Sequence, residues 1–256
     1  MEKPGKYIYC IIDTKQERNF GPIGIDGEDV LTIDYDDLSM VVSSHPTQKL
    51  VVDRQNMLAH EKVIEAIMKE FDSVLPVRFG TVSSDADEVR NLLDKRYREF
   101  KSLLRNMNHK VELGVKGVWK DMNTIFKEIV EGGKEIKRLK GLIQKEKGKK
   151  NIQAKMEVGK MVEKVLTIKK EKEAKVIVSA VKDAASDYKL NRTVGDQMFM
   201  NASFLVDKGR EKEFDNIMDD LSDKHKSRIK FMYAGPLPLF NFVNIIIYPE
   251  EWEKSM

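Results

Sequence analysis

Cysteine and long apolar runs are both scarce in this sequence. Cys10 is the only cysteine among 256 residues, which excludes an intrachain disulfide and gives no sign of an oxidising compartment. The first apolar run, residues 7–12, is too short to span a membrane and lacks a signal-peptide cleavage pattern. We therefore expect a cytoplasmic protein without a membrane partner.

An excess of charge of one sign is also missing. The chain has 45 Lys and Arg residues against 42 Asp and Glu residues, a formal net charge of +3. That charge is too small to indicate a nucleic-acid or membrane partner by itself. Hydrophobic residues make up 41% and charged residues 34%, which is enough for buried cores beneath a charged surface. The length favours about two domains.

The first part of the chain alternates between strand and helix patterns. The fully apolar residues 7–12 predict a strand buried on both faces, and two shorter strand candidates and one extended segment follow, at residues 30–33, 38–43 and 75–82. Asp53 is a candidate N-cap for a helix. The buried face of that helix is expected to carry residues at spacings of three and four: Met57, His60, Ile64, Ile67 and Phe71. Residues 89–107 predict a second helix.

The second part begins with a half-buried strand at residues 111–119, which alternate between apolar and polar. Residues 121–190 then predict two long, charged helices joined by a lysine-rich turn, as in a helical hairpin. Strand and helix patterns return at residues 198–206, 214–221, 229–233 and 242–248. The whole pattern predicts an α+β fold with two domains, residues 1–108 and 109–256.

No catalytic, cofactor-binding or metal-binding site emerges from the motifs. His60-Glu61 resembles the start of a zinc-protease motif, but the second histidine would have to occupy the position of Ile64. The simpler reading is that His60 is a hydrogen-bonded, partly buried residue of the apolar stripe. Cys10 lies in an apolar strand and is expected to be buried and unreactive. Arg78 stands among apolar neighbours and is expected to form a partly buried fork to carboxylates or carbonyls.

The segment Lys134–Lys150 has eight basic and two acidic residues, a net charge of +6. Such a run can attract phosphates, so a nucleic-acid-binding protein is the alternative function. The run has none of the aromatic residues that stack on bases, and a solvated helix end and turn is the simpler interpretation. The turn is expected to face solvent or an acidic partner, with possible contacts from Lys145, Lys147, Lys149 and Lys150.

Five sequence blocks, in order, resemble the gas vesicle protein F/L family over nearly the whole chain. The most specific block joins residues 59–66 to residues 75–82, and the last covers residues 235–243. The remaining blocks are residues 7–12, 111–116 and 201–206. Within the two named blocks, the motif residues are His60, Glu61, Pro76, Arg78, Phe79, Gly80, Gly235, Pro236, Pro238 and Phe240. The last block departs from the family at Leu237 and Leu239, where an aromatic residue and a further proline are usual.

The resemblance implies an accessory or minor structural protein of gas vesicles, the hollow protein shells that give aquatic microbes buoyancy. It implies an N-terminal α+β domain and a C-terminal domain with a modified ferredoxin-like fold. It further implies association with the major shell protein and with other gas vesicle accessory proteins during assembly, and a structural role for the motif residues. We accordingly expect no enzyme activity, no cofactor and no nucleic-acid partner, and a location in the cytoplasm at the gas vesicle.

Overall fold

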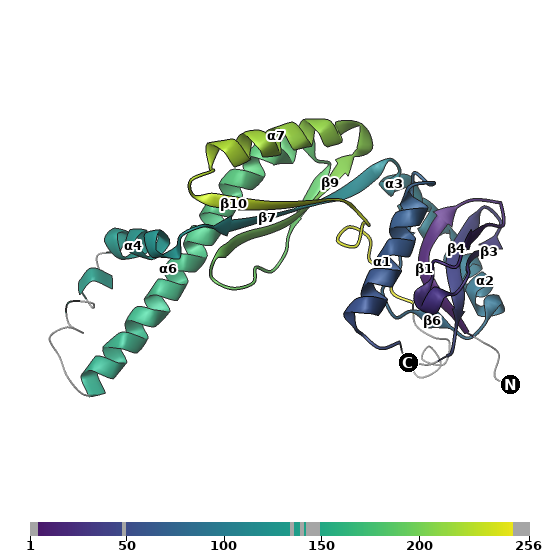
Figure 1. Ribbon diagram of the computed structural model, residues 1–256, viewed down its shortest axis with the longest axis horizontal. Coiled ribbons are helices and arrows are strands. Elements are labelled where there is room, and N and C mark those ends of the chain that lie inside the picture. The colour runs from purple at the N-terminus through teal and green to yellow at the C-terminus, as the bar shows by residue number, and fades with distance from the viewer. Residues whose placement is uncertain (1–4, 48–49, 134–135, 139–140, 142–148, 248–256) are drawn as a thin grey trace. The chain divides into compact units, whose positions relative to one another are not determined.

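The computed structural model describes residues 5–47, 50–133, 136–138, 141 and 149–247 (Figure 1). The chain divides into two compact units. The first takes in the described parts of residues 1–112, 207–209 and 236–256, and the second takes in those of residues 113–206 and 210–235. The first unit is therefore not one continuous stretch, because the chain returns to it after residue 235.

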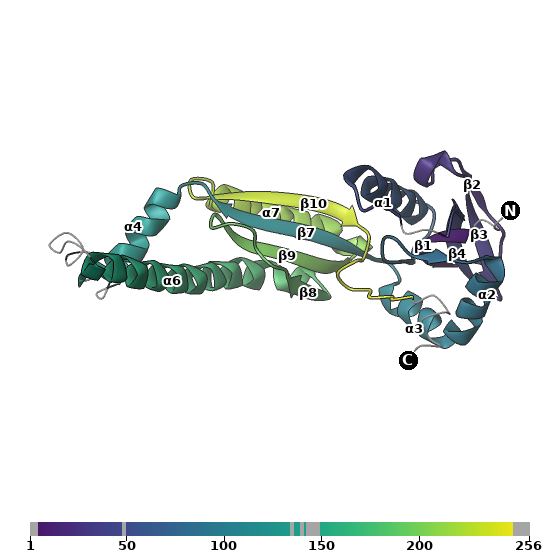
Figure 2. The same cartoon turned by 90° about the horizontal axis from the view of Figure 1, so that it is seen from below.

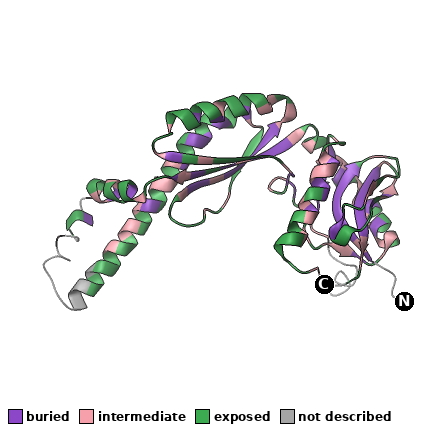
Figure 3. Ribbon diagram, in the orientation of Figure 1, coloured by how far each residue is buried: buried purple, intermediate pink, exposed green. Residues whose placement is uncertain are grey.

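The first unit is built on an antiparallel sheet in which β1 (Gly5–Asp13) is central. The strand order is β2-β3-β4-β1-β5, with β6 also paired to β1. The other strands are β2 (Asn19–Gly21), β3 (Val30–Tyr35), β4 (Leu38–His45), β5 (Val74–Pro76) and β6 (Val82–Ser83). Every side chain from Tyr7 to Ile12 is fully buried, which confirms the prediction of a strand buried on both faces (Figure 3).

Helices cover both faces of this sheet, and this explains the burial of β1. Helix α1 (Arg54–Met68) lies on one face, while α2 (Ala86–Lys95) and α3 (Tyr97–Met107) lie on the other (Figure 2). The Asp53 side chain accepts a hydrogen bond from the backbone N–H of Asn56, so the predicted N-cap is confirmed. A short 3-10 helix, η1 (Ile25–Gly27), completes the elements of this unit's N-terminal part.

The second unit has a four-stranded sheet with strand order β10-β7-β9-β8. Its strands are β7 (Lys110–Trp119), β8 (Asp187–Leu190), β9 (Met198–Asp207) and β10 (Ile229–Leu237). Helix α6 (Lys149–Val181) is the long charged helix expected from the sequence, and α7 (Glu211–Lys224) packs Phe214 against Phe204 of β9. Two short 3-10 helices, η2 (Lys182–Ala184) and η3 (Lys208–Arg210), follow α6 and β9. The α+β fold predicted from the sequence is confirmed.

The structure differs from four predicted elements. The helix predicted over residues 89–107 is two helices, because the backbone of Arg96 (φ −110°, ψ 18°) leaves the helical region. The long helix expected from residue 121 ends early: α4 (Met122–Gly132) stops where Gly133 takes an extended conformation. The second long helix, expected to reach residue 190, ends at Val181, and residues 187–190 form strand β8 instead. The strand predicted at residues 242–248 is wrong for the described residues 242–247, which pair with no sheet. Val243 and Ile245 are nevertheless buried, so this apolar run reflects core packing and not a strand.

Candidate functional site

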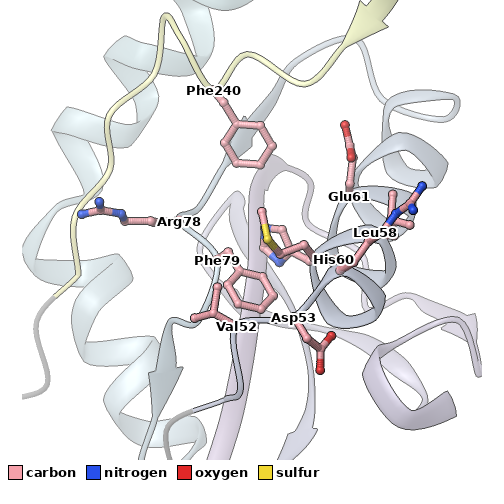
Figure 4. Close-up of a pocket in the computed structure, with 10 residues that line it drawn as sticks. Val52, Asp53, Leu58, His60, Glu61, Arg78, Phe79 and Phe240 are labelled. Atoms are coloured by element: carbon pink, nitrogen blue, oxygen red, sulfur yellow. The ribbon is translucent and has the colours of Figure 1, made fainter. Parts of the chain in front are cut away.

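The first unit has a hollow beside the N-terminal half of α1, which we call the α1 groove (Figure 4). Its volume is about 640 Å³. Three parts of the chain contribute: the start of α1 with the residues before it, the connection between β5 and β6, and the segment after β10. The lining residues are Val52, Asp53, Arg54, Met57, Leu58, His60, Glu61, Arg78, Phe79 and Phe240.

Large apolar side chains line the groove and remain exposed. The exposed fraction is 75% for Val52, 50% for Met57, 43% for Leu58 and 41% for Phe240. The prediction that Met57 belongs to the buried face of α1 is wrong, because Met57 lines the groove and does not pack on the sheet. The sequence held a signal for this surface. Adjacent helical residues point about 100° apart, so Met57 and Leu58 cannot both lie on one narrow buried stripe.

His60 forms the floor of the groove and is only 2% exposed. Its Nε2 lies 3.1 Å from the carbonyl oxygen of Val77, and its Nδ1 lies 2.9 Å from the hydroxyl of Tyr7. Burial lowers the pKa of His60 to about 4. The expected hydrogen bonding of His60 is therefore confirmed, and the residue is buried more deeply than the partly buried position predicted from the sequence. Because both ring nitrogens already have partners, the imidazole has no free nitrogen for a metal ion or for proton transfer.

The Tyr7 hydroxyl bridges His60 and the loop between β5 and β6. The Tyr7 hydroxyl accepts a hydrogen bond of 3.0 Å from the backbone N–H of Gly80. Gly80 has a φ of +84°, a conformation that glycine adopts without strain. The ring of Phe79 meets that of His60 edge-on, with 5.6 Å between ring centroids. Residues of two motif blocks, far apart in the sequence, thus meet around one buried imidazole.

The last motif block supplies the outer wall of the groove. The ring of Phe240 lies over His60, with 6.1 Å between the centroids. The next residue, Asn241, donates from its backbone N–H (3.0 Å) and its side-chain amide (2.5 Å) to the carboxylate of Glu112. Glu112 is almost fully buried, whereas the alternating sequence pattern places it on the polar face of the strand at residues 111–119. Pro238 is buried beside this turn, whereas Gly235 and Pro236 are exposed at the end of β10.

Two charged residues of the groove, Arg78 and Glu61, are more exposed than His60. Arg78 is exposed, so the prediction of a partly buried fork is wrong, and its side chain makes no hydrogen bond or ion pair to a described residue. Figure 4 shows it pointing away from Phe79 and His60. Glu61 is half-buried, and burial, followed by repulsion from Glu65, raises its pKa. Pro76 lies apart from the groove in β5, where it pairs with Cys10.

The lysine contacts suggested by the sequence stay a prediction. Lys145 and Lys147 lie outside the described residues. Lys149 and Lys150 begin α6, but their side chains lie outside the description. The alternative of nucleic-acid binding through Lys134–Lys150 is likewise untested by the described part of this run. Cys10 is buried, as expected, and burial raises the pKa of its thiol.

Neither a metal centre nor a membrane-spanning helix occurs among the described residues. Within them, no group of three or more His, Cys, Asp or Glu side chains is placed to hold a metal ion. In the same part of the chain, no helix combines the length and apolar character needed to cross a membrane.

Comparison with known proteins identifies the relatives of this chain. Gas vesicle protein F of Dolichospermum flosaquae is 24% identical over 242 residues, covering 93% of this chain and 97% of the relative. Gas vesicle protein F of Streptomyces sp. (strain CB03234) is 28% identical, covering 93% and 98%. Gas vesicle protein L1 of Halobacterium salinarum is 22% identical, covering 93% and 90%. Relatives of both kinds, F and L, therefore match nearly the whole chain.

The fold agrees with this relationship. The crystal structure of the gas vesicle protein GvpF from Anabaena sp. PCC7120 matches with a TM-score of 0.82 at 23% identity, covering 96% of this chain and 100% of that one. GvpF from Microcystis aeruginosa matches with a TM-score of 0.79 at 22% identity. A family model described as gas vesicle synthesis protein GvpL/GvpF matches residues 5–244. The chain therefore belongs to the GvpL/GvpF family of gas vesicle synthesis proteins, and its role is related to gas vesicles.

Proposed function

We propose that this protein binds the major gas vesicle shell protein and other gas vesicle accessory proteins, and so supports gas vesicle assembly in the cytoplasm. The observation that carries the proposal is the family match over residues 5–244. The α1 groove supports it, because an apolar hollow that stays exposed is the kind of surface that binds another protein.

The physical need for such a partner follows from the nature of a gas-filled shell. A shell subunit must present apolar surface to gas, and the same surface exposed to water drives aggregation before assembly. A protein that covers this surface would prevent that aggregation and keep the shell subunit available for assembly. The charged residues of this chain, 34% of the total, would keep the complex dispersed in water.

A non-enzymatic role fits the groove better than catalysis. Both ring nitrogens of His60 are engaged in hydrogen bonds, and the Arg78 guanidinium is exposed. An active site needs a nucleophile, or an acid and a base, within hydrogen-bonding reach of one another. The titratable side chains that line the groove form no such arrangement among the described residues.

Co-expression with the shell protein tests the proposal. The full chain, carrying an affinity tag, is expected to capture the shell protein from a lysate, and a strain lacking this chain is expected to make fewer or misshapen gas vesicles. An irrelevant tagged protein of similar size and charge serves as the control for capture. Failure to capture the shell protein, together with normal vesicles in the deletion strain, would reject the proposed function.

A further inference from the structure

We infer that the α1 groove binds an amphipathic helix of the shell protein, which places aliphatic side chains in the groove and a lysine or arginine beside Glu61. This inference rests on the proposed function and adds to it the surface, the type of segment and the charge of the residue that is recognised.

The backbone around the groove favours a helix over an extended peptide. A peptide that binds as an added strand needs an unpaired strand edge to supply backbone hydrogen bonds. The residues that line the groove lie in α1, in the coil before it, and in turns near residues 78–80 and 238–242, and none lies in a strand. A bound helix satisfies its own backbone groups and needs only side-chain contacts.

The apolar lining suits the aliphatic side chains of such a helix. Met57 and Leu58 come from α1, while Phe79 and Phe240 come from the two turns. A volume of about 640 Å³ is large enough for several aliphatic side chains. Methionine is flexible and adapts its shape to different apolar partners, and the Phe240 ring gives the opposite wall a rigid surface.

The charges at the rim indicate the polar residue of the partner. Glu61 is half-buried and has no hydrogen bond or ion pair to a described residue, and Glu65 follows one turn later on α1. Burial, and after it repulsion from Glu65, raises the pKa of Glu61. Covering the groove would bury Glu61 further, and an unpaired carboxylate is costly to bury. A cationic side chain from the bound helix would remove that cost.

Arg78 gives the groove a second charge of opposite sign. Figure 4 shows Arg78 and Glu61 on opposite sides of Phe240. An acidic residue of the bound helix beside Arg78 and a basic residue beside Glu61 would fix its direction, since charge complementarity selects register and orientation more than affinity. Arg54 also lines the groove on α1, so the α1 wall is not uniformly acidic.

Capture of co-expressed shell protein by variants of the full chain tests the inference. Met57→Glu and Leu58→Glu add charge to the apolar wall, and each is expected to reduce the captured shell protein by about tenfold. Glu61→Lys is expected to reduce capture by several-fold, and Glu61→Gln by less. Matched controls on α6, Val176→Glu at an exposed valine and Glu157→Lys at an exposed glutamate, are expected to capture as the wild type does. Thermal unfolding of each variant shows that it is folded.

Each outcome decides a separate question. If the wild-type chain captures no shell protein, the proposed function and this inference both fail. If the wild type captures it and the Met57 and Leu58 variants do so equally well, the groove is not the site, although the proposed function stands. If only Glu61→Lys is neutral, the assignment of a basic residue is wrong. If the groove variants instead abolish self-association of this chain, the occupant is a second copy and the assignment to the shell protein is overturned.

Discussion

The hydroxyl of Tyr7 lies 2.9 Å from Nδ1 of His60, and the surroundings determine which atom donates. Nε2 of the same ring lies 3.1 Å from the carbonyl oxygen of Val77, which can only accept, so Nε2 carries the proton. Nδ1 is therefore the acceptor and Tyr7 the donor. This pair joins β1 to α1 beneath the groove, so the shape of the groove floor depends on a neutral His60.

The stability of the protein is expected to fall as the pH drops from about 6.5 toward 4. Burial lowers the pKa of His60 from 6.5 to about 4, so between these values the unfolded chain binds more protons than the folded one. His60 favours the folded state fully above pH 6.5, and that contribution is lost as the pH falls. The total loss is on the order of 3 kcal/mol. Urea denaturation across this pH range measures it.

The control for this prediction is His60→Asn. The variant is expected to be less stable than the wild type at neutral pH, because it loses buried hydrogen bonds and ring contacts. Its free energy of unfolding should change less between pH 6.5 and pH 4. Equal changes in the variant and the wild type would show that other groups cause the pH dependence.

Removing the Glu112 carboxylate is expected to destabilise the turn that holds Phe240. Glu112→Ala leaves the backbone N–H and the side-chain amide of Asn241 without their acceptor, at a cost of about 2–3 kcal/mol. Asn241→Ala is expected to cost less, since its backbone N–H still reaches Glu112. Because the two residues are partners, the double variant should lose less stability than the sum of the single variants. Additive losses in denaturant titrations would contradict the pairing.

Two glycines in the second unit are expected to respond in opposite ways to alanine. A Cβ atom at Gly117 would lie 2.5 Å from the Phe199 ring, which is stacked on Trp119 and has little room to move. Gly117→Ala should therefore cost about 1–3 kcal/mol. Gly159 lies within α6 with open space around it, so Gly159→Ala should be neutral or stabilise by up to about 1 kcal/mol. Thermal unfolding of both variants gives the comparison, and a loss of stability in Gly159→Ala would refute the second half.

Replacing Arg228 by lysine is expected to destabilise the second unit by about 1–2 kcal/mol. The guanidinium forks to both carboxylate oxygens of Glu128, at 2.6 and 2.9 Å, and reaches Glu173 at 2.8 Å. Lysine keeps the charge but cannot make this fork. Arg90→Lys is the control, because Arg90 and Asp87 form an exposed pair that should contribute less than about 0.5 kcal/mol. Equal effects of the two substitutions on the midpoint of denaturation would contradict this account.

The same network predicts a second, more acidic transition. Hydrogen bonds from Arg228 lower the pKa of Glu128 from 4.5 to about 2. A depressed carboxylate pKa stabilises the fold above the unfolded value, and that contribution is lost as the pH falls from 4.5 toward 2. The pH profile of Arg228→Lys should be flatter than that of the wild type in this range, whereas the slopes of the two profiles should agree between pH 6.5 and pH 4.5.

The sequence by itself determined the type and approximate extent of most elements. The run Tyr7–Ile12 is apolar at every position, which is typical of a strand buried on both faces. The capping of α1 by Asp53 and the long helix α6 follow from local chemistry, because capping and helical periodicity act between residues a few positions apart. The ordered motif blocks also predict the family, and the family match over residues 5–244 confirms that prediction.

Only the tertiary structure decided which of these residues meet. Glu112 and Asn241 are 129 positions apart, and no local pattern marks their pairing. The return of the chain to the first unit places Phe240 over His60 and turns the start of α1 into one wall of a groove. Contacts with distant parts of the chain also decide burial at two other positions. Met57 is exposed although it lies on the predicted apolar stripe of α1, and Val243 is buried although it lies in no strand. Helical or strand periodicity gives the direction of a side chain on its own element, whereas the surface that covers that side chain comes from residues elsewhere in the chain.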